Sequence, residues 1–299
     1  MVDVLRSLET LFERNVTHLP AGNLLHEYKH ENVFSWEQNL DHAAITRQMQ
    51  NYWHWTVYIG IGYLLTARWL VGVMADRKPI NLRTILFLWN FGLAVFSIMG
   101  AYRTTEEFYD TLFNHGFYKS CCFGFDPSSV AAHWFLFFAI SKIVELGDTI
   151  FLILRKRPLS VLHCWHHFSV MIYTFHSGAE YLAAGRWFMW MNFIAHSVMY
   201  TYFAITSLGI RVPRHIAQCV TIVQIAQMVV GVSIGLSVLV LKNYYKYPCQ
   251  QTDANLYLSF VIYVSYMILF INFFINAYCQ KRPISTAPSK RTDKKLKSK

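Results

Sequence analysis

Charged side chains are scarce in this sequence, and their scarcity excludes an ordinary soluble domain. Asp, Glu, Lys and Arg make up 15 % of the 299 residues, while apolar residues make up 54 % and aromatic residues 17 %. Soluble domains carry roughly 25 % charged residues. Long apolar runs take the place of charge here, and about 20 such residues span the hydrocarbon core of a bilayer. The composition therefore predicts an integral membrane protein.

The first 45 residues lack the basic and apolar regions of a cleavable signal peptide, so we expect the first span to direct insertion. We predict an all-α fold in three parts: a luminal segment at 1–50, a seven-helix transmembrane domain at 51–280 and a disordered basic cytosolic tail at 281–299. The seven candidate spans are roughly 52–74, 84–102, 130–154, 161–178, 186–208, 213–241 and 256–279.

The basic residues are unevenly distributed between alternate connections of these spans. Sixteen of the 27 lie on one predicted side, which should be cytosolic because cytosolic loops are enriched in Lys and Arg. The N-terminus is then luminal and the C-terminus cytosolic. The net charge of +10 belongs to the cytosolic face, so nucleic acid is not an expected partner. The sixteen residues are Arg77, Lys78, Arg83, Arg155, Lys156, Arg157, Arg211, Arg214 and eight in the tail.

Two features of the predicted luminal side agree with this orientation. Asn15 begins an Asn-Val-Thr glycosylation sequon. Three of the six cysteines also fall in luminal loops, where disulfides persist. We expect Cys121 or Cys122 to pair with Cys249.

Polar residues recur at helical spacing within four successive spans, where ionisable groups are costly. For any single residue, a hydrogen bond that only joins two helices remains an alternative. Four stripes together predict a shared chamber, polar at its cytosolic mouth and apolar below, suited to a charged head with a long hydrocarbon tail. The stripes are Lys142, Glu145 and Asp148; His163, His166 and His167; Asn192, His196, Tyr200 and Phe203; and Thr221, Gln224 and Gln227.

The run "HCWHH" at 163–167 has three interpretations. It could be a hydrogen-bonded interior cluster, a metal site like those of membrane di-iron oxygenases, or a nucleophile or general base. Di-iron sites need about eight histidines in three boxes to fill two coordination shells, and this sequence has one box. The shortage of ligands disfavours metal, although a di-iron desaturase or hydroxylase stays as the alternative function, beside a seven-helix receptor or transporter.

Four motifs resemble the very-long-chain fatty-acid elongases, the 3-ketoacyl-CoA synthases of the endoplasmic reticulum, over residues 50–280. They are K-x-x-E-x-x-D-T, which ends at Thr149; H-x-x-H-H as "HCWHH"; H-x-x-M-Y-x-Y-Y as "HSVMYTYF"; and T-x-x-Q-x-x-Q as "TIVQIAQ". Phe203 departs from the third motif by lacking a hydroxyl. The flanking stretches are most similar to the branch that extends saturated and monounsaturated chains.

The resemblance implies a fold in which spans two to seven form an inverted barrel around a narrow acyl tunnel, with span one outside. It implies condensation of acyl-CoA with malonyl-CoA to 3-ketoacyl-CoA, CO2 and CoA, without a cofactor. Expected partners are membrane lipid, the ketoacyl-reductase, dehydratase and enoyl-reductase of the cycle, and a second copy of the chain. Lys295 and Lys297 resemble an endoplasmic reticulum retrieval signal.

The resemblance also implies roles for the polar residues. His166 is the first candidate to carry the acyl group and His196 the second, with His163 and His167 beside them. Glu145 and Asp148 are expected to orient imidazoles by accepting from their second nitrogen. The CoA phosphates are expected at Arg155, Lys156, Arg211 and Arg214. Residues expected to bind or orient substrate are Lys142, Glu145, Asp148, Thr149, Asn192, Tyr200, Gln224 and Gln227.

Overall fold

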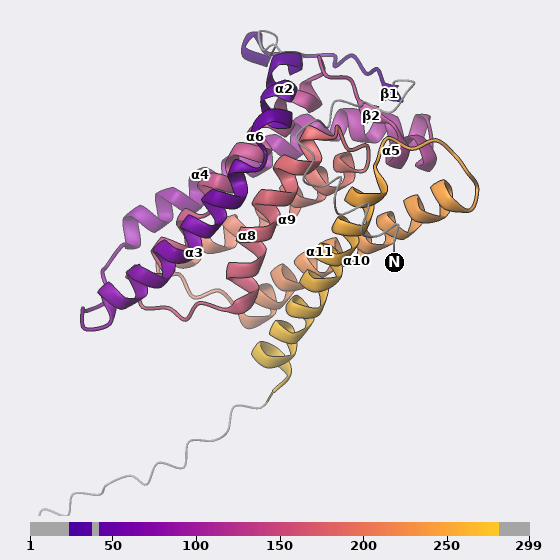
Figure 1. Cartoon of the computed structure of the whole chain (residues 1–299). Coiled ribbons are helices and arrows are strands. Elements are labelled where there is room, and N and C mark those ends of the chain that lie inside the picture. The colour runs from indigo at the N-terminus through magenta and orange to yellow at the C-terminus, as the bar shows by residue number, and fades with distance from the viewer. Residues whose placement is uncertain (1–23, 38–41, 281–299) are drawn as a thin grey trace, which may run out of the picture.

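The computed structural model describes residues 24–37 and 42–280, which are mostly helical (Figure 1). Asn15, Lys295 and Lys297 lie outside these residues, so glycosylation and retrieval stay predictions. The helices are α2 (His42–Tyr52), α3 (Trp55–Met74), α4 (Arg83–Tyr109), α5 (Phe117–Cys122), α6 (Val130–Val144), α7 (Gly147–Leu154), α8 (Val161–Ala179), α9 (Gly185–Ser207), α10 (Arg214–Asn243) and α11 (Asp253–Phe274). Turns of π-helix at Asp110–Asn114 and Ile275–Cys279 extend α4 and α11.

Hydroxyl side chains fix where three of the helices begin. The side chains of Ser129, Ser160 and Thr252 each accept a hydrogen bond from a backbone N–H in the first turn of α6, α8 and α11. Such caps satisfy donors that a helix leaves free at its N-terminus. The helix starts therefore follow from local sequence.

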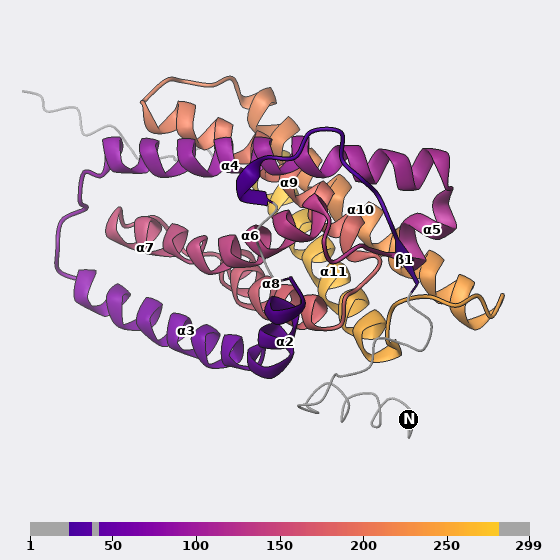
Figure 2. The same cartoon turned by 90° about the horizontal axis from the view of Figure 1, so that it is seen from above.

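Six helices pack in a closed order around an interior that contains the polar stripes. Contacts run from α4 to α6, α8, α11, α10, α9 and back to α4, while α3 packs on α7 and α8 at the edge of the bundle (Figure 2). This arrangement agrees with the expected position of span one outside the other helices. The barrel's inverted sense in a membrane stays a prediction.

Four helical segments are long and apolar enough to cross a membrane: Trp55–Met74, Arg83–Asn114, Arg214–Asn243 and Asp253–Cys279. These match four of the seven predicted spans, so the full count stays a prediction. The expectation of one continuous helix over 130–154 was wrong, because the helix ends at Val144 and restarts at Gly147. The helices α8 and α9 carry the inward polar residues, which lower their mean hydropathy.

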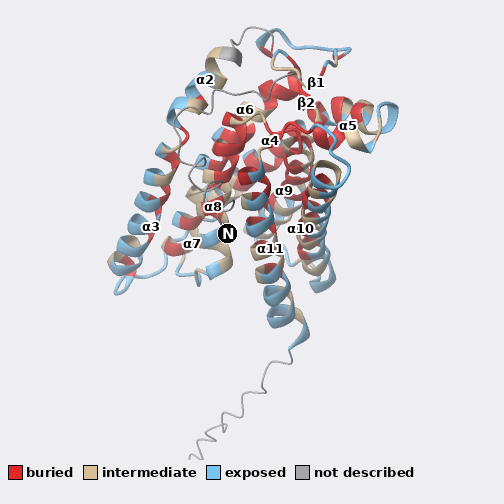
Figure 3. Ribbon diagram, turned by 45° about the vertical axis from the view of Figure 1, so that its right-hand side comes forward, coloured by how far each residue is buried: buried red, intermediate tan, exposed pale blue. Residues whose placement is uncertain are grey.

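The two ends of the bundle differ in charge and burial. One end, here called the basic end, carries the connections 75–82, 155–160 and 208–213 and the C-terminus of α11. The other, here called the disulfide end, carries α5, the start of α6 and the Cys122–Cys249 disulfide. Buried residues gather towards the disulfide end, whereas the basic end is more exposed (Figure 3).

Residues 24–37 form a strap across the disulfide end. The all-α prediction omitted its short parallel strand, β1 (Leu25–His26), which pairs with β2 (Gly124–Phe125). A 3-10 turn at Ser35–Glu37 follows, and the buried Glu37 carboxylate accepts hydrogen bonds from Arg103 Nε at 3.0 Å and NH2 at 2.6 Å. Two-residue strands give no alternating pattern, so the sequence could not reveal them.

Candidate functional site

A cavity of about 390 Å³, here called the mouth cavity, opens towards the basic end between α8, α9, α10 and α11. All three histidines of the box line it, together with His196 of α9. The polar stripes of α8, α9 and α10 therefore meet, as the sequence predicted. The remaining predicted residues that line it are Asn192, Tyr200, Thr221, Gln224 and Gln227.

The stripe of α6 reaches this cavity through a buried network of charges. Lys142 Nζ donates to Glu145 Oε1 and to Asn192 Oδ1, both at 2.8 Å. His196 Nδ1 lies 3.5 Å from the same carboxylate oxygen, and Asn192 Nδ2 lies 3.3 Å from His196 Nε2. The carboxylate and the amide thus fix the orientation of the His196 ring from both of its nitrogens.

Glu145 lies at the C-terminus of α6, in helical register with the residues it contacts there. Its N–H donates to Ser141 O, and its Oε1 accepts from Ser141 Oγ at 3.0 Å and from Lys142. The helix breaks just after it. Gly147 begins α7 where a Cβ would collide with the Trp89 ring, so a glycine permits the close approach of α4.

Asp148 is held by two donors from neighbouring helices. Trp89 Nε1 donates to Oδ1 at 2.6 Å, and Tyr200 OH donates to Oδ2 at 2.8 Å. The expectation that Asp148 orients an imidazole is therefore not met by the contacts seen here. The carboxylate instead joins α4, α7 and α9 beneath the histidines.

His163 and His167 of the box make contacts on the side that faces α3. His163 Nε2 lies 2.8 Å from Thr149 Oγ1, which is itself 2.8 Å from Tyr63 OH. The His167 ring packs against the His163 ring, with centroids 4.4 Å apart. A hydrogen bond thus holds the His163 ring, whereas ring contacts alone hold the His167 ring.

The His166 ring lines both the mouth cavity and a second, apolar cavity behind it. It packs on the Tyr266 ring with centroids 4.9 Å apart, and T-shaped on His167 at 5.3 Å. Among the described residues, no hydrogen bond to its ring nitrogens is seen. An imidazole held by aromatic contacts alone keeps a nitrogen lone pair for chemistry.

The stripe of α10 contributes amides to the same cavity wall. Gln227 lines both cavities, and Gln224 Nε2 lies 3.0 Å from Met199 Sδ. Thr221 Oγ1 donates to Ala217 O at 3.1 Å. Phe203, which departs from the motif, is half exposed at the mouth and is not part of the Asp148 network.

Basic side chains line the rim beside the mouth cavity. Arg155 lies in two adjoining hollows, one of which reaches His163 and His167, and Lys156 lines the outer one. Arg83 and Arg157 also line this rim, although the sequence analysis gave them no role beyond orientation. Lys156 Nζ and Arg214 NH2 donate to backbone carbonyls, so each has a structural contact as well.

The cysteines at the disulfide end form one of the two predicted pairings. Cys122 is bonded to Cys249, whereas Cys121 is free and fully buried. The bond ties the segment before α6 to the segment before α11. It lies at the opposite end of the bundle from the mouth cavity.

The histidine box does not form a group of ligands for a metal ion. Among residues 24–37 and 42–280, one set of His, Cys, Asp or Glu has three ligand atoms mutually within 4.8 Å: His26, Asp110 and His115. That set lies at the disulfide end, beside the strap. This geometry disfavours the di-iron alternative for the box.

Sequence reasoning missed several residues that hold the site in place. Trp89 and Tyr266 each contact a motif residue across the bundle, and Ser141 contacts Glu145 one turn away on its own helix. Tyr63 contacts Thr149 from α3, the helix outside the ring. Aromatic residues are common throughout the chain, so no spacing signal distinguished the three aromatic residues.

Comparison with known proteins agrees with this geometry. Residues 48–286 match the ELO (GNS1/SUR4) family. The chain is 48 % identical over 255 residues, 85 % of its own length and 88 % of the relative's, to a protein of Caenorhabditis elegans named putative fatty acid elongase 4. It is 38 % identical over 261 residues to human very long chain fatty acid elongase 6, covering 86 % of this chain and 94 % of the relative. It is 36 % identical over 234 residues to human very long chain fatty acid elongase 3, covering 78 % and 86 %. The chain therefore belongs to the ELO family of fatty acid elongases.

Proposed function

We propose that the protein catalyses the condensing step of elongation, in which acyl-CoA and malonyl-CoA give 3-ketoacyl-CoA, CO2 and CoA. The observation that carries this proposal is the place of His166, between a polar mouth and an apolar cavity. A thioester at the histidine would have its CoA in the mouth and its tail in the apolar part. The proposed substrates are long-chain saturated or monounsaturated acyl-CoA.

In the first half-reaction, a ring nitrogen of His166 attacks the thioester carbonyl. The carbon–sulfur bond breaks, CoA leaves as the thiolate and takes up the imidazole proton, and an acyl-imidazole remains. Such an intermediate hydrolyses readily, so an apolar pocket that excludes water protects it.

In the second half-reaction, malonyl-CoA loses CO2, and the electron pair of the broken carbon–carbon bond becomes an enolate. The enolate carbon attacks the acyl carbonyl and the carbon–nitrogen bond breaks. The departing imidazolate takes up one proton from solvent, which restores the imidazole. Electrons balance without an oxidant or reductant, so the proposal requires no cofactor. Asn192, which accepts from Lys142 and lines both cavities beside His166, is the proposed amide donor to the enolate oxygen.

The remaining residues support these steps in the proposal. Glu145 positions His196, which serves as the base or, as second candidate, carries the acyl group. His163 and His167 shape the wall beside His166, while Gln224 and Gln227 face the tail. Arg155 and Lys156 bind the CoA phosphates; Arg83 and Arg157 join them because they share the rim. Arg211 and Arg214 lie on the same end.

We propose the endoplasmic reticulum membrane as the location, with the basic end cytosolic. The uneven distribution of Lys and Arg supports this orientation. The proposed partners are acyl-CoA, malonyl-CoA, lipid, a second copy of the chain and the reductases and dehydratase that complete the cycle.

The test is incubation of the purified protein with acyl-CoA alone, followed by intact mass measurement. We expect an added acyl group in the parent protein and in His215→Ala, an exposed control on α10, and its loss in His166→Ala. Full adduct in a His166→Ala, His196→Ala double variant would refute the assignment. A desaturase would instead contain iron and release no CO2 from malonyl-CoA.

A further inference from the structure

The strap runs along one face of α4 at the disulfide end, where β1 lies near α5 (Figure 1). Three residues of α4 and its π-helical extension, Arg103, Glu106 and Asp110, recur every three or four positions and so share that face. Arg103 and Glu106 hold the strap by hydrogen bonds. Asp110 contacts His26 of β1, and this third contact has the chemistry of a metal site.

His26, Asp110 and His115 bring three ligand atoms together. His26 Nε2 lies 2.9 Å and His115 Nε2 lies 3.5 Å from Asp110 Oδ2, and the three atoms are within 4.8 Å of one another. Zinc binds imidazole nitrogen and carboxylate oxygen at about 2.0–2.2 Å, so two ligands at a tetrahedral angle are about 3.3 Å apart. Both distances to Oδ2 are close to that separation.

The π-helical turn at the end of α4 places two of these ligands on one face. Asp110 begins the turn and His115 directly follows it, five residues later. In an α-helix, residues five apart point about 140° away from each other. The hydrogen bonds of a π-helix run between residues five apart, so the turn brings such residues onto the same side. The irregular turn therefore aligns the carboxylate with the second imidazole.

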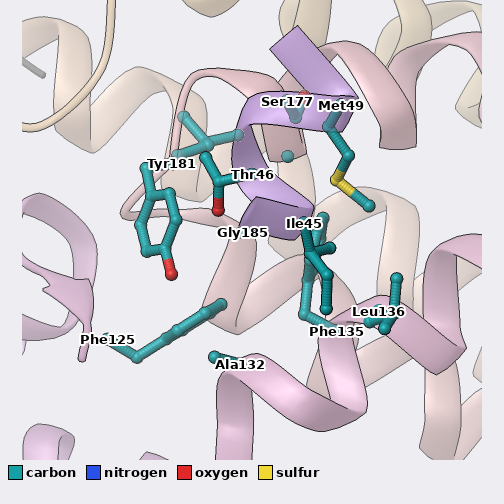
Figure 4. A pocket seen from close by; sticks show the side chains of 12 residues that line it. Ile45, Thr46, Met49, Phe125, Ala132, Phe135, Leu136, Ser177, Tyr181 and Gly185 are labelled. Atoms are coloured by element: carbon teal, nitrogen blue, oxygen red, sulfur yellow. The ribbon is translucent and has the colours of Figure 1, made fainter. Parts of the chain in front are cut away.

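The third ligand is held in place by the strand pairing. His26 pairs with Phe125 of β2, and Asp126 N donates to His26 O at 3.2 Å. Figure 4 shows Phe125 in the wall of an apolar cavity, near Ala132 of α6. The main chain of His26 is thus anchored to the body of the bundle, so little ordering of this ligand is needed when a cation binds.

The Asp110 carboxylate is oriented by its second oxygen, and the cluster is open on one side. Asn114 Nδ2 donates to Asp110 Oδ1 at 2.8 Å, so Oδ2 faces the imidazoles, and ligating carboxylates commonly receive such a hydrogen bond. The exposed fraction of the side chain is 7 % for His26, 19 % for Asp110 and 38 % for His115. A cation can therefore enter from solution beside His115.

The ligand set selects the class of cation. Two imidazoles and one carboxylate suit a borderline divalent cation such as zinc. Magnesium and calcium prefer sites made of oxygen atoms alone. Zinc also accepts three protein ligands with water in the fourth position.

We propose that His26, Asp110 and His115 form a zinc site that fastens the strap to the end of α4, with water as the fourth ligand. Zinc takes the place of the hydrogen bond between His26 and Asp110, and each imidazole binds through Nε2 with its proton on Nδ1. Binding involves no oxidation or reduction. The site lies at the opposite end of the bundle from the mouth cavity, so it is independent of the proposed condensation.

The first test is zinc binding by the full-length protein in detergent, purified with a tag that contains no histidine and freed of metal with a chelator. Competition with a chromophoric zinc indicator should show one zinc per chain. His115→Gln removes a ligand at an exposed position, so we expect folding to survive while binding weakens at least tenfold. His215→Gln makes the same change at an exposed histidine on α10 and should bind within twofold of the parent. Equal binding by the parent and His115→Gln would overturn the proposal.

Two further measurements separate this site from zinc bound elsewhere. His166→Ala in the histidine box should retain the full stoichiometry, and its loss there would overturn the proposal. X-ray absorption at the zinc edge should show nitrogen and oxygen ligands at about 2.0–2.1 Å. A sulfur shell near 2.3 Å, typical of cysteine ligands, would also overturn it.

Hydrogen exchange tests whether zinc fastens the strap. We expect zinc to slow amide exchange within residues 24–30 at least threefold in the parent protein and to leave it unchanged in His115→Gln, since exchange follows local opening. The variant without zinc controls for the hydrogen bond between His26 and Asp110, which it retains. Binding of zinc by the parent without slower exchange in the strap would refute the fastening role.

Discussion

Tyr200 and Phe203 lie on the same motif of α9, yet only one of them contributes a hydroxyl to the buried network. Replacing Tyr200 by Phe leaves the buried Asp148 carboxylate without one of its two donors, at a cost of about 1–3 kcal/mol. Phe203→Tyr adds a hydroxyl to a half-exposed ring and should change the free energy of unfolding by less than about 0.5 kcal/mol. Thermal unfolding in detergent measures both, and equal effects would contradict this account.

Lys142 and Glu145 form a buried ion pair in which each charge depends on the other. Their side chains are 1 % and 3 % exposed, so the single variants Lys142→Met and Glu145→Gln each leave one uncompensated buried group. We expect Lys142→Met to lower the free energy of unfolding by about 3–5 kcal/mol. The double variant should be more stable than Lys142→Met, as a double-mutant cycle would show. Additive losses would mean that the pair is not coupled.

For single residues, the sequence predicted which side chains line the same cavity but not which atoms each side chain bonds to. Helical spacing placed His166, His196 and Gln227 on faces that share a cavity, because that inference needs only the 3.6-residue period. The partner of Asp148 was predicted wrongly, since Trp89 and Tyr200 reach it from helices whose rotation the spacing does not fix.

The strap at 24–37 is an element whose attachment depends on pH. Burial alone would raise the pKa of Glu37, but hydrogen bonds from Arg103, Trp134 and the Phe34 N–H hold its pKa below the ordinary 4.5. A carboxyl with a depressed pKa stabilises the fold above its unfolded pKa, and this stability is lost as pH falls through the folded pKa. We expect the thermal midpoint to fall more steeply below pH 4.5 in the parent than in Glu37→Gln.

His30 also makes stability depend on pH, and it does so equally in the parent and in Glu37→Gln. Burial lowers its pKa from 6.5, so its stabilising effect begins to be lost below pH 6.5 in both proteins. His133 packs on the neighbouring Trp36 ring. Parallel curves for the parent and Glu37→Gln below pH 4.5 would show that Glu37 contributes nothing to the effect.

Among the elements, long apolar helices were predicted well and irregular ones were missed. The spans at 52–74 and 213–241 agree with α3 and α10 within a few residues, because length and hydropathy define them. The break at Glu145 gave no such signal, since neither proline nor a run of polar residues marks it. Beside the break, Gly147 packs closely against the Trp89 ring, which is a contact between distant parts of the chain.

For the whole molecule, the Cys122–Cys249 disulfide closes a loop of 127 residues that contains most of the ring. Its removal by Cys249→Ser should lower the free energy of unfolding by about 2–5 kcal/mol and change mobility on a non-reducing gel. Cys121 and Cys122 are both fully buried, so alkylation should be slow at both thiols in the folded variant and reach both on unfolding. Unchanged mobility on the non-reducing gel would contradict the pairing.

The closed order of helix contacts was not available from hydropathy, which orders spans along the chain but not around a ring. The distribution of Lys and Arg indicated which helix ends lie on the same side of the bundle, and Arg83 and Arg157 do line the same rim. The neighbours of each helix come from side-chain packing, such as the T-shaped contact of Phe96 with Phe193 between α4 and α9.

Because the ring of helices is closed, an acyl chain held inside it can enter or leave only through the mouth cavity at the basic end. Entry sideways from the lipid would require two packed helices to separate, so a tail has to slide in lengthwise from the basic end and back out by the same route. In the proposed reaction, each product has to withdraw completely before another substrate enters. Every added pair of carbons lengthens that withdrawal, so we expect product release, rather than bond formation, to become slower as the chain grows.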